Sequence, residues 1–72
     1  MRLDYHPETG SLCFDLAGHA SAESREISEG VVLDDDDAGN LVGIDIDAAS
    51  RKVDLDRLVL SRLPGKVETA AA

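Results

Sequence analysis

The 72-residue chain has a single cysteine, Cys13, and only two aromatic residues, Tyr5 and Phe14. One cysteine excludes a disulfide within the chain, and the scarcity of aromatics means that any core must be mainly aliphatic. A domain of this size seldom gains more than about 3–5 kcal/mol of net stability from one hydrophobic core. Further stability would have to come from a bound metal or from self-association.

Basic residues are also scarce, because seven Lys and Arg stand against 15 Asp and Glu and give a net charge of −8. This charge repels phosphate backbones and anionic membranes, which argues against direct nucleic-acid binding. No apolar run approaches the roughly 20 residues of a membrane span. The stretch MRLDYHPETG lacks the apolar segment of a signal peptide. We therefore expect a cytoplasmic protein that contacts neither nucleic acid nor membrane.

Apolar and polar residues alternate along much of the chain, a pattern typical of half-buried strands. Pro7 to Gly10 predict a tight turn between the first two strands, and Asp37 to Asn40 predict another between the last two. The first two strands should form a hairpin whose apolar side chains share one face. The five predicted strands cover residues 1–6, 11–16, 22–27, 31–33 and 41–46.

After Ile46 the apolar residues follow helical spacing instead. Asp54 is a suitable N-cap for this helix, and Pro64-Gly65 would end it. We therefore predict an α+β fold, a small antiparallel β-meander of about five strands with one C-terminal helix packed on one face. The helix stripe consists of Leu55, Leu58, Val59 and Leu63.

The predicted domain organisation is simple, because the sequence contains neither an internal repeat nor a linker. Residues 1–65 are expected to form a single small domain. Residues 66–72 are expected to form a disordered tail.

The segments YHPETGSLCFDL and EGVVLDDDDAGNLVGIDI resemble the YuzE-like family of small bacterial proteins of unknown function, over roughly residues 1–50. Glu29-Gly30, the aspartates and Gly39 carry the most specific part of this likeness. His6 and Cys13 depart from the family pattern in the first hairpin. The resemblance implies a β-meander plus helix without an established activity. Because some relatives are encoded beside small toxin-like proteins, it also suggests an antitoxin-like role with a partner protein.

The four consecutive aspartates invite comparison with a calcium-binding EF-hand loop. With Asp34 at position 1, Asp36 and Asp45 fall at positions 3 and 12, but Ala38 at position 5 lacks a ligand oxygen. The flanking segments are strand-like, whereas an EF-hand needs helices. We therefore interpret the run as the exposed tip of a hairpin, and Asp34, Asp36 and Asp45 remain the candidate metal ligands.

The sequence offers no recognisable catalytic arrangement. Zinc sites usually need close pairs of Cys or His, and the chain has only Cys13, His6 and His19. Cys13 lies in an alternating strand, opposite the side that carries Leu12 and Phe14, so we interpret it as a structural residue. We expect neither catalytic residues nor a cofactor.

The hypothesis that follows is a non-enzymatic protein-interaction module, antitoxin-like and partnered with a small basic protein. Its candidate partner-binding residues are Asp35, Asp36, Asp37 and Leu60, an apolar residue off the helix stripe. One alternative is a divalent-metal-binding or hydrolytic role at the Asp34–Asp37 cluster. Another is a self-associating structural protein, for which we expect a homodimer, because leftover apolar surface and open sheet edges favour association.

Overall fold

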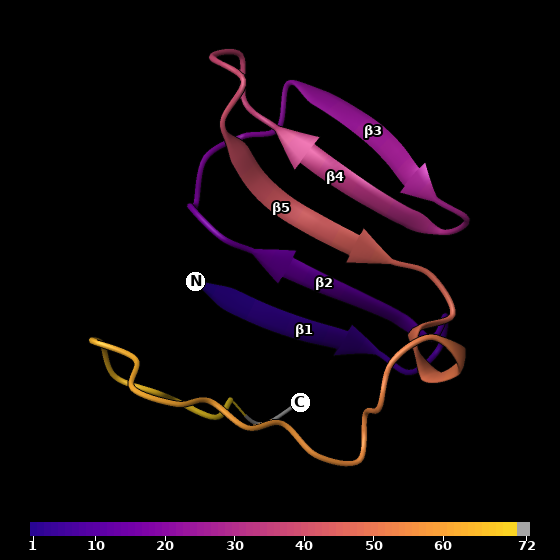
Figure 1. Cartoon of the computed structure of the whole chain (residues 1–72), viewed down its shortest axis with the longest axis vertical. Helices are drawn as coiled ribbons and strands as arrows, with labels where there is room; N and C mark the ends of the chain where they lie inside the picture. Colours follow the sequence, from indigo (N-terminus) through magenta and orange to yellow (C-terminus); the bar gives the residue numbers. More distant parts are fainter. Residues whose placement is uncertain (71–72) are drawn as a thin grey trace.

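The computed structural model of the chain describes residues 1–70, in which five strands form one antiparallel sheet (Figure 1). The order of the strands across the sheet is β1-β2-β5-β4-β3. Every strand lies within two residues of its predicted range, so the strand predictions are confirmed. The strands are β1 (Arg2–His6), β2 (Ser11–Asp15), β3 (Glu23–Ser28), β4 (Val31–Asp35) and β5 (Leu41–Ile46).

The sheet is a meander with one longer connection. Consecutive strands are neighbours except β2 and β3, because β5 lies between β2 and β4. The connecting segment between β2 and β3 is fastened at both ends by backbone hydrogen bonds. The amide of Leu16 donates to the carbonyl of Val42 at 2.9 Å, and the amide of Ala22 donates to the carbonyl of Asp35 at 2.8 Å.

The pairing of the strands sorts the side chains onto two different faces. Leu3 pairs with Phe14 and Tyr5 with Leu12, which confirms the predicted shared face of the first hairpin. We call this side the apolar face, and its residues are Leu3, Tyr5, Leu12, Phe14, Val31, Leu33, Ile44 and Ile46. We call the opposite side the acidic face, and its residues include Asp4, Cys13, Asp15, Val32, Asp34 and Asp45.

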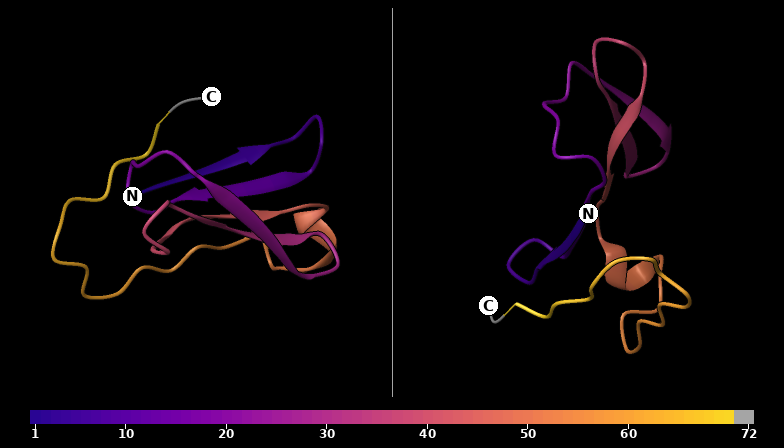
Figure 2. Two further views of the ribbon diagram at one scale, coloured as in Figure 1. Left: turned by 90° about the horizontal axis from the view of Figure 1, so that it is seen from above. Right: turned by 90° about the vertical axis from the view of Figure 1, so that its left-hand side faces the viewer.

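Very little of the molecule forms a core. Among the described residues, the buried hydrophobic side chains are those of Leu12, Val42 and Ala49. Ala49 belongs to η1 (Ala49–Arg51), a single turn of 3-10 helix whose amide at Ala49 donates to the carbonyl of Gly10 at 2.8 Å. This turn packs against the β1–β2 turn at one end of the sheet. Figure 2 shows that the sheet itself is a single twisted layer.

The predicted C-terminal helix is wrong, and the fold is all-β rather than α+β. Residues 52–70 form neither helix nor strand, and all of them are exposed. In the face-on view of Figure 1 this segment lies beyond β1, outside the outline of the sheet. Leu55, Leu58 and Leu63 therefore do not cover the apolar face.

The physical reason is that helical spacing alone does not form a helix. Between Asp54 and Pro64 there is room for only about ten helical residues, fewer than the roughly 12–15 that an isolated helix needs in water. The expected cap, Asp54, does accept a hydrogen bond from the amide of Asp56 at 2.9 Å, two residues ahead, but no helix follows it. Arg62 has a positive φ of 56°, which is incompatible with a continuous helix.

The remaining C-terminal prediction concerns residues 66–72, whose last two residues lie outside the described residues. Within residues 1–70, no helix has the length and apolar character that crossing a membrane requires.

Candidate functional site on the acidic face

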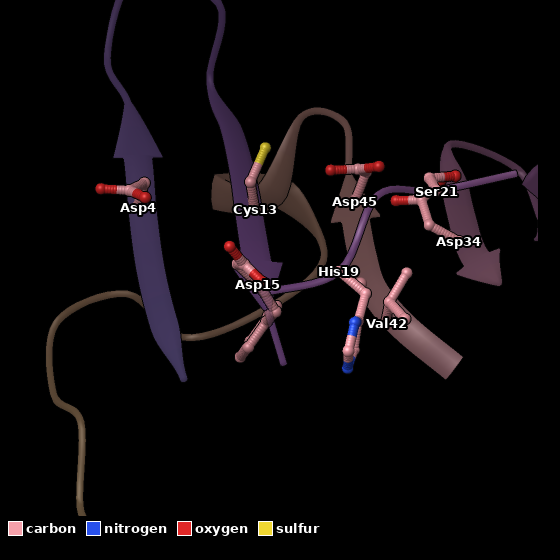
Figure 3. Close-up of a pocket in the computed structure, with 10 residues that line it drawn as sticks. Asp4, Cys13, Asp15, His19, Ser21, Asp34, Val42 and Asp45 are labelled. Atoms are coloured by element: carbon pink, nitrogen blue, oxygen red, sulfur yellow. The ribbon is translucent and has the colours of Figure 1, made fainter. Parts of the chain in front are cut away.

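Aspartates from four adjacent strands gather on the acidic face. Asp4 of β1 pairs with Cys13 of β2, which in turn pairs with Asp45 of β5. Figure 3 shows these three side chains and Asp34 of β4 in a row across the strands. They border an open depression of about 210 Å³, which is smaller than the usual small-molecule pocket of about 300–1,000 Å³.

Asp34 and Asp45 share a side-chain hydrogen bond, so one of the two carboxyls must supply the proton. The hydrogen bond with Asp45, together with one from the Ser24 hydroxyl at 2.7 Å, lowers the pKa of Asp34. The same contact with Asp34, together with burial, raises the pKa of Asp45. The environment therefore assigns different roles to two identical side chains, with Asp34 the acceptor and Asp45 the proton carrier.

Cys13 lies beside this pair and is a weak acid there. Burial raises the pKa of its thiol to about 11, and a hydrogen bond to Asp45 and the charges of Asp45, Asp4 and Asp34 add to that effect. At neutral pH the group is therefore a thiol rather than a thiolate, and only the thiolate is a strong nucleophile. The prediction that Cys13 projects away from Leu12 and Phe14 is confirmed by the strand pairing.

Gly43 makes the close approach of these groups possible. It is buried and pairs with both Asp15 and Asp34 across the neighbouring strands. A Cβ atom at this position would lie 3.1 Å from the carbonyl oxygen of Phe14 and 3.2 Å from Oδ2 of Asp34. Glycine therefore leaves the space in which the Asp34 carboxylate lies over β5.

The four consecutive aspartates do not form one exposed tip, which corrects the sequence interpretation. Asp34 and Asp35 belong to strand β4, so their side chains lie on opposite faces. Asp35 is the one buried charged residue among those described, 6% exposed, and its carboxylate accepts a hydrogen bond of 2.8 Å from Nε of Arg25. As a candidate partner-binding residue it is therefore already occupied within the chain.

Asp36 folds back into the turn between β4 and β5. Its Oδ1 atom accepts hydrogen bonds from the amides of Ala38 at 2.9 Å and Asn40 at 2.8 Å. These backbone donors, first of all that of Asn40, lower the pKa of Asp36. Asp37 is exposed, and the two residues line a second surface hollow of about 310 Å³, together with His19. Of the predicted aspartates, Asp37 is thus the most available to a partner.

The candidate metal ligands are not brought together as a set. Asp34 and Asp45 contact each other, whereas the Asp36 carboxylate is engaged within its own turn. Among the described residues, no three His, Cys, Asp or Glu side chains are arranged to hold a metal ion. Leu60 is 47% exposed and lies in the irregular C-terminal segment.

Two features of the site were missed from sequence. One is the Asp34–Asp45–Cys13 cluster, and the other is the pairing of Asp35 with Arg25. The alternation of side chains along a strand could have predicted part of both features. If β4 is extended by two residues, Asp34 and Asp35 fall on opposite faces of the sheet. The partners themselves depend on the pairing of strands distant in sequence.

Charge is distributed unevenly along the chain. Residues 1–50 contain 12 of the 15 acidic residues but only two of the seven basic ones, Arg2 and Arg25. Both arginines are already paired, Arg2 with Asp4 at 2.9 Å and Arg25 with Asp35. The sheet is therefore strongly acidic, whereas the segment that follows it carries five basic and three acidic residues.

Together, the fold and this site define a small all-β protein with a one-layer sheet, one face of which is apolar and the other acidic. The family described as "Protein of unknown function (DUF2283)" matches residues 2–50, and the chain belongs to this family. The matched residues contain all five strands and leave out the irregular C-terminal segment. No curated protein and no solved structure matches the chain.

Proposed function

We propose that this protein is a non-enzymatic protein-interaction module. The observation that carries the proposal is the apolar face, which no second layer of the described residues covers. Val31, Leu33, Ile44 and Ile46 in the middle of the sheet remain only half-buried. Tyr5 on β1 is 45% exposed. Contiguous apolar surface of this kind marks interaction sites in soluble proteins, because its exposure to water is unfavourable.

The acidic face supports the second part of the proposal, a basic partner protein in the manner of an antitoxin-like component. Because both basic side chains of the sheet are paired, the unpaired carboxylates dominate the potential on this side. A basic surface would be attracted to that potential, and its association would be faster at low ionic strength.

The state of Cys13 favours binding over nucleophilic catalysis. A thiol whose pKa is raised to about 11 is almost fully protonated at neutral pH. The site also lies on an open depression rather than in a closed cavity, so it does not exclude water in the way that strengthens electrostatic catalysis.

Co-expression with the products of neighbouring genes, followed by pull-down, tests the basic partner. Val32→Lys places a positive charge on the acidic face, between its pairing partners Asp45 and Glu26. Ser50→Lys makes the same charge change at an exposed position outside the sheet. The proposal predicts that Val32→Lys weakens capture, that Ser50→Lys retains it, and that added salt weakens it. A stable monomer that captures no neighbouring product would contradict the proposal.

The divalent-metal alternative requires its own measurement. Calorimetric titration with calcium addresses Asp34, Asp36 and Asp45 directly. Absence of heat at millimolar calcium would eliminate the metal site, whereas binding abolished by Asp45→Asn would favour it over the interaction module.

A further inference from the structure

The chain exposes more surface than a folded monomer of its mass. Its accessible surface is 5878 Å² for 7.6 kDa, whereas the usual scaling for monomeric proteins gives about 4,300 Å². The radius of gyration is 13.0 Å, against about 11 Å for a compact chain of this length. About 1,600 Å² per chain is therefore left over for an interface.

The chemistry of the apolar face fits a second copy of the same face. On β1, β2, β5 and the first part of β4 its side chains are aliphatic apart from Tyr5 and Phe14, and charged residues lie only at its β3 edge, where Arg25 pairs with Asp35 and Glu23 lies opposite Asp35. Two such faces can approach each other through their apolar middle strands, while the acidic faces point outward and the charged residues of β3 stay at the rim. We infer that a second copy covers this face, so that two sheets pack face to face about 10 Å apart in a homodimer.

The areas agree with this arrangement only when the exposed C-terminal segment is part of the interface. Two copies have about 3,200 Å² of surplus surface between them, within the roughly 2,000–5,000 Å² buried in obligate homodimers. Five strands spaced about 4.8 Å apart and five to six residues long have a flat footprint of only about 450 Å². The sheet faces alone do not absorb the surplus.

The C-terminal segment supplies further apolar surface for the same interface. Leu58 and Val59 are 65% and 62% exposed, and Leu55, Leu60 and Leu63 are exposed as well. The segment's excess of basic residues also offsets the acidic charge of the sheets that it adjoins. The inference rests on the proposed interaction function, for which it names the partner of the apolar face.

Two neighbouring valines of β4 provide a matched test in the full-length chain. Val31 and Val32 are both half-buried, but Val31 lies on the apolar face and Val32 on the acidic face. Sedimentation equilibrium and light scattering over a concentration series should give the wild-type protein twice the mass of one chain. Val31→Lys buries an unpaired charge in the interface and should raise the dimer Kd by more than about 30-fold. Val32→Lys should change it less than about 3-fold.

Circular dichroism establishes that each variant is folded. If Val31→Lys unfolds, Leu3→Lys replaces it, because Leu3 is on the apolar face of edge strand β1 and is already 36% exposed. Equal dissociation of the variants on both faces would overturn the inference. So would a wild-type monomer at all concentrations. If that monomer captured a different protein through Val31, the proposed function would stand and only the second copy would be rejected. A monomer without any partner would reject both.

Discussion

Replacing Asp45 with asparagine should stabilise the protein at neutral pH. The side-chain amide of asparagine is nearly isosteric with a protonated carboxyl group. At every pH it can donate a hydrogen bond to the Asp34 carboxylate, whereas an ionised Asp45 carboxylate repels that group. Cross-strand pairs of this kind change stability by about 0.2–1 kcal/mol. For a domain of this size, that corresponds to a rise in Tm of about 1–8 °C.

The pH dependence follows from the directions of the two pKa shifts. Because the pKa of Asp45 is raised on folding, its protonated form stabilises the wild-type protein. This stabilisation is complete below the ordinary pKa of 3.8 and is lost as pH rises through the raised pKa. The increase in Tm caused by Asp45→Asn should therefore grow as pH rises from 3.8 through the raised pKa of Asp45. It should disappear below about pH 3.8. The lowered pKa of Asp34 acts in the opposite sense, because its contribution is present above 3.8 and is lost as pH falls.

Asp34→Asn is the matched comparison: it also removes the repulsion between two ionised carboxylates, but it weakens the acceptor of the Ser24 hydroxyl, so at pH 7 it should stabilise the protein less than Asp45→Asn does. Thermal melts of the wild type and both variants from pH 3 to pH 8, at one protein concentration, measure these differences. The reasoning is refuted if Asp34→Asn raises Tm more than Asp45→Asn at pH 7, or if the difference for Asp45→Asn is independent of pH.

Three further predictions concern the same sheet. Arg25→Ala leaves the buried Asp35 carboxylate without its 2.8 Å partner, and urea unfolding should show a loss of about 1–3 kcal/mol; an unchanged midpoint would contradict the assignment. Gly43→Ala forces a Cβ against the carbonyl oxygen of Phe14 and should cost about 1–3 kcal/mol in the same assay. Because the pKa of Cys13 is raised from 9.0 to about 11, its thiolate fraction at pH 7 is about 100-fold lower than that of an ordinary cysteine, although the more basic thiolate is the stronger nucleophile. Cys13 should therefore react with iodoacetamide at pH 7 about 10-fold more slowly, and an equal rate would show that the thiol is not protected.

The strands could be predicted from sequence because strand formation leaves a local signature. Alternation of Leu3 and Tyr5 with polar residues identifies both the strand and its buried side, and the turn residues at Pro7 and Gly39 mark the hairpin ends. The same local reasoning predicted a helix from Leu55 to Leu63, where the spacing is helical. Spacing describes which residues would share a face if a helix formed, but a short helix is stable only against a surface that holds it.

The site could be predicted only in part, because its contacts join residues distant in sequence. The run of aspartates was evident, yet the hydrogen bond between Asp34 and Asp45 requires the pairing of β4 with β5, and the contact with Cys13 requires β5 beside β2. The position of β5 between β2 and β4 has no counterpart in the local sequence pattern. Consequently the sequence indicated the composition of the acidic face but not its geometry.

Because Asp34 to Asp37 are identical residues, the sequence of the turn does little to fix the register in which β4 pairs with β5. A slip of one residue would still place an aspartate at most positions of the turn, but it would exchange the two faces of β4. Leu33 would then face the acidic side, while Asp34 would point toward the apolar one. Correct alignment must therefore be specified from outside the run, by Arg25 holding Asp35 and by the space above Gly43 that accepts Asp34.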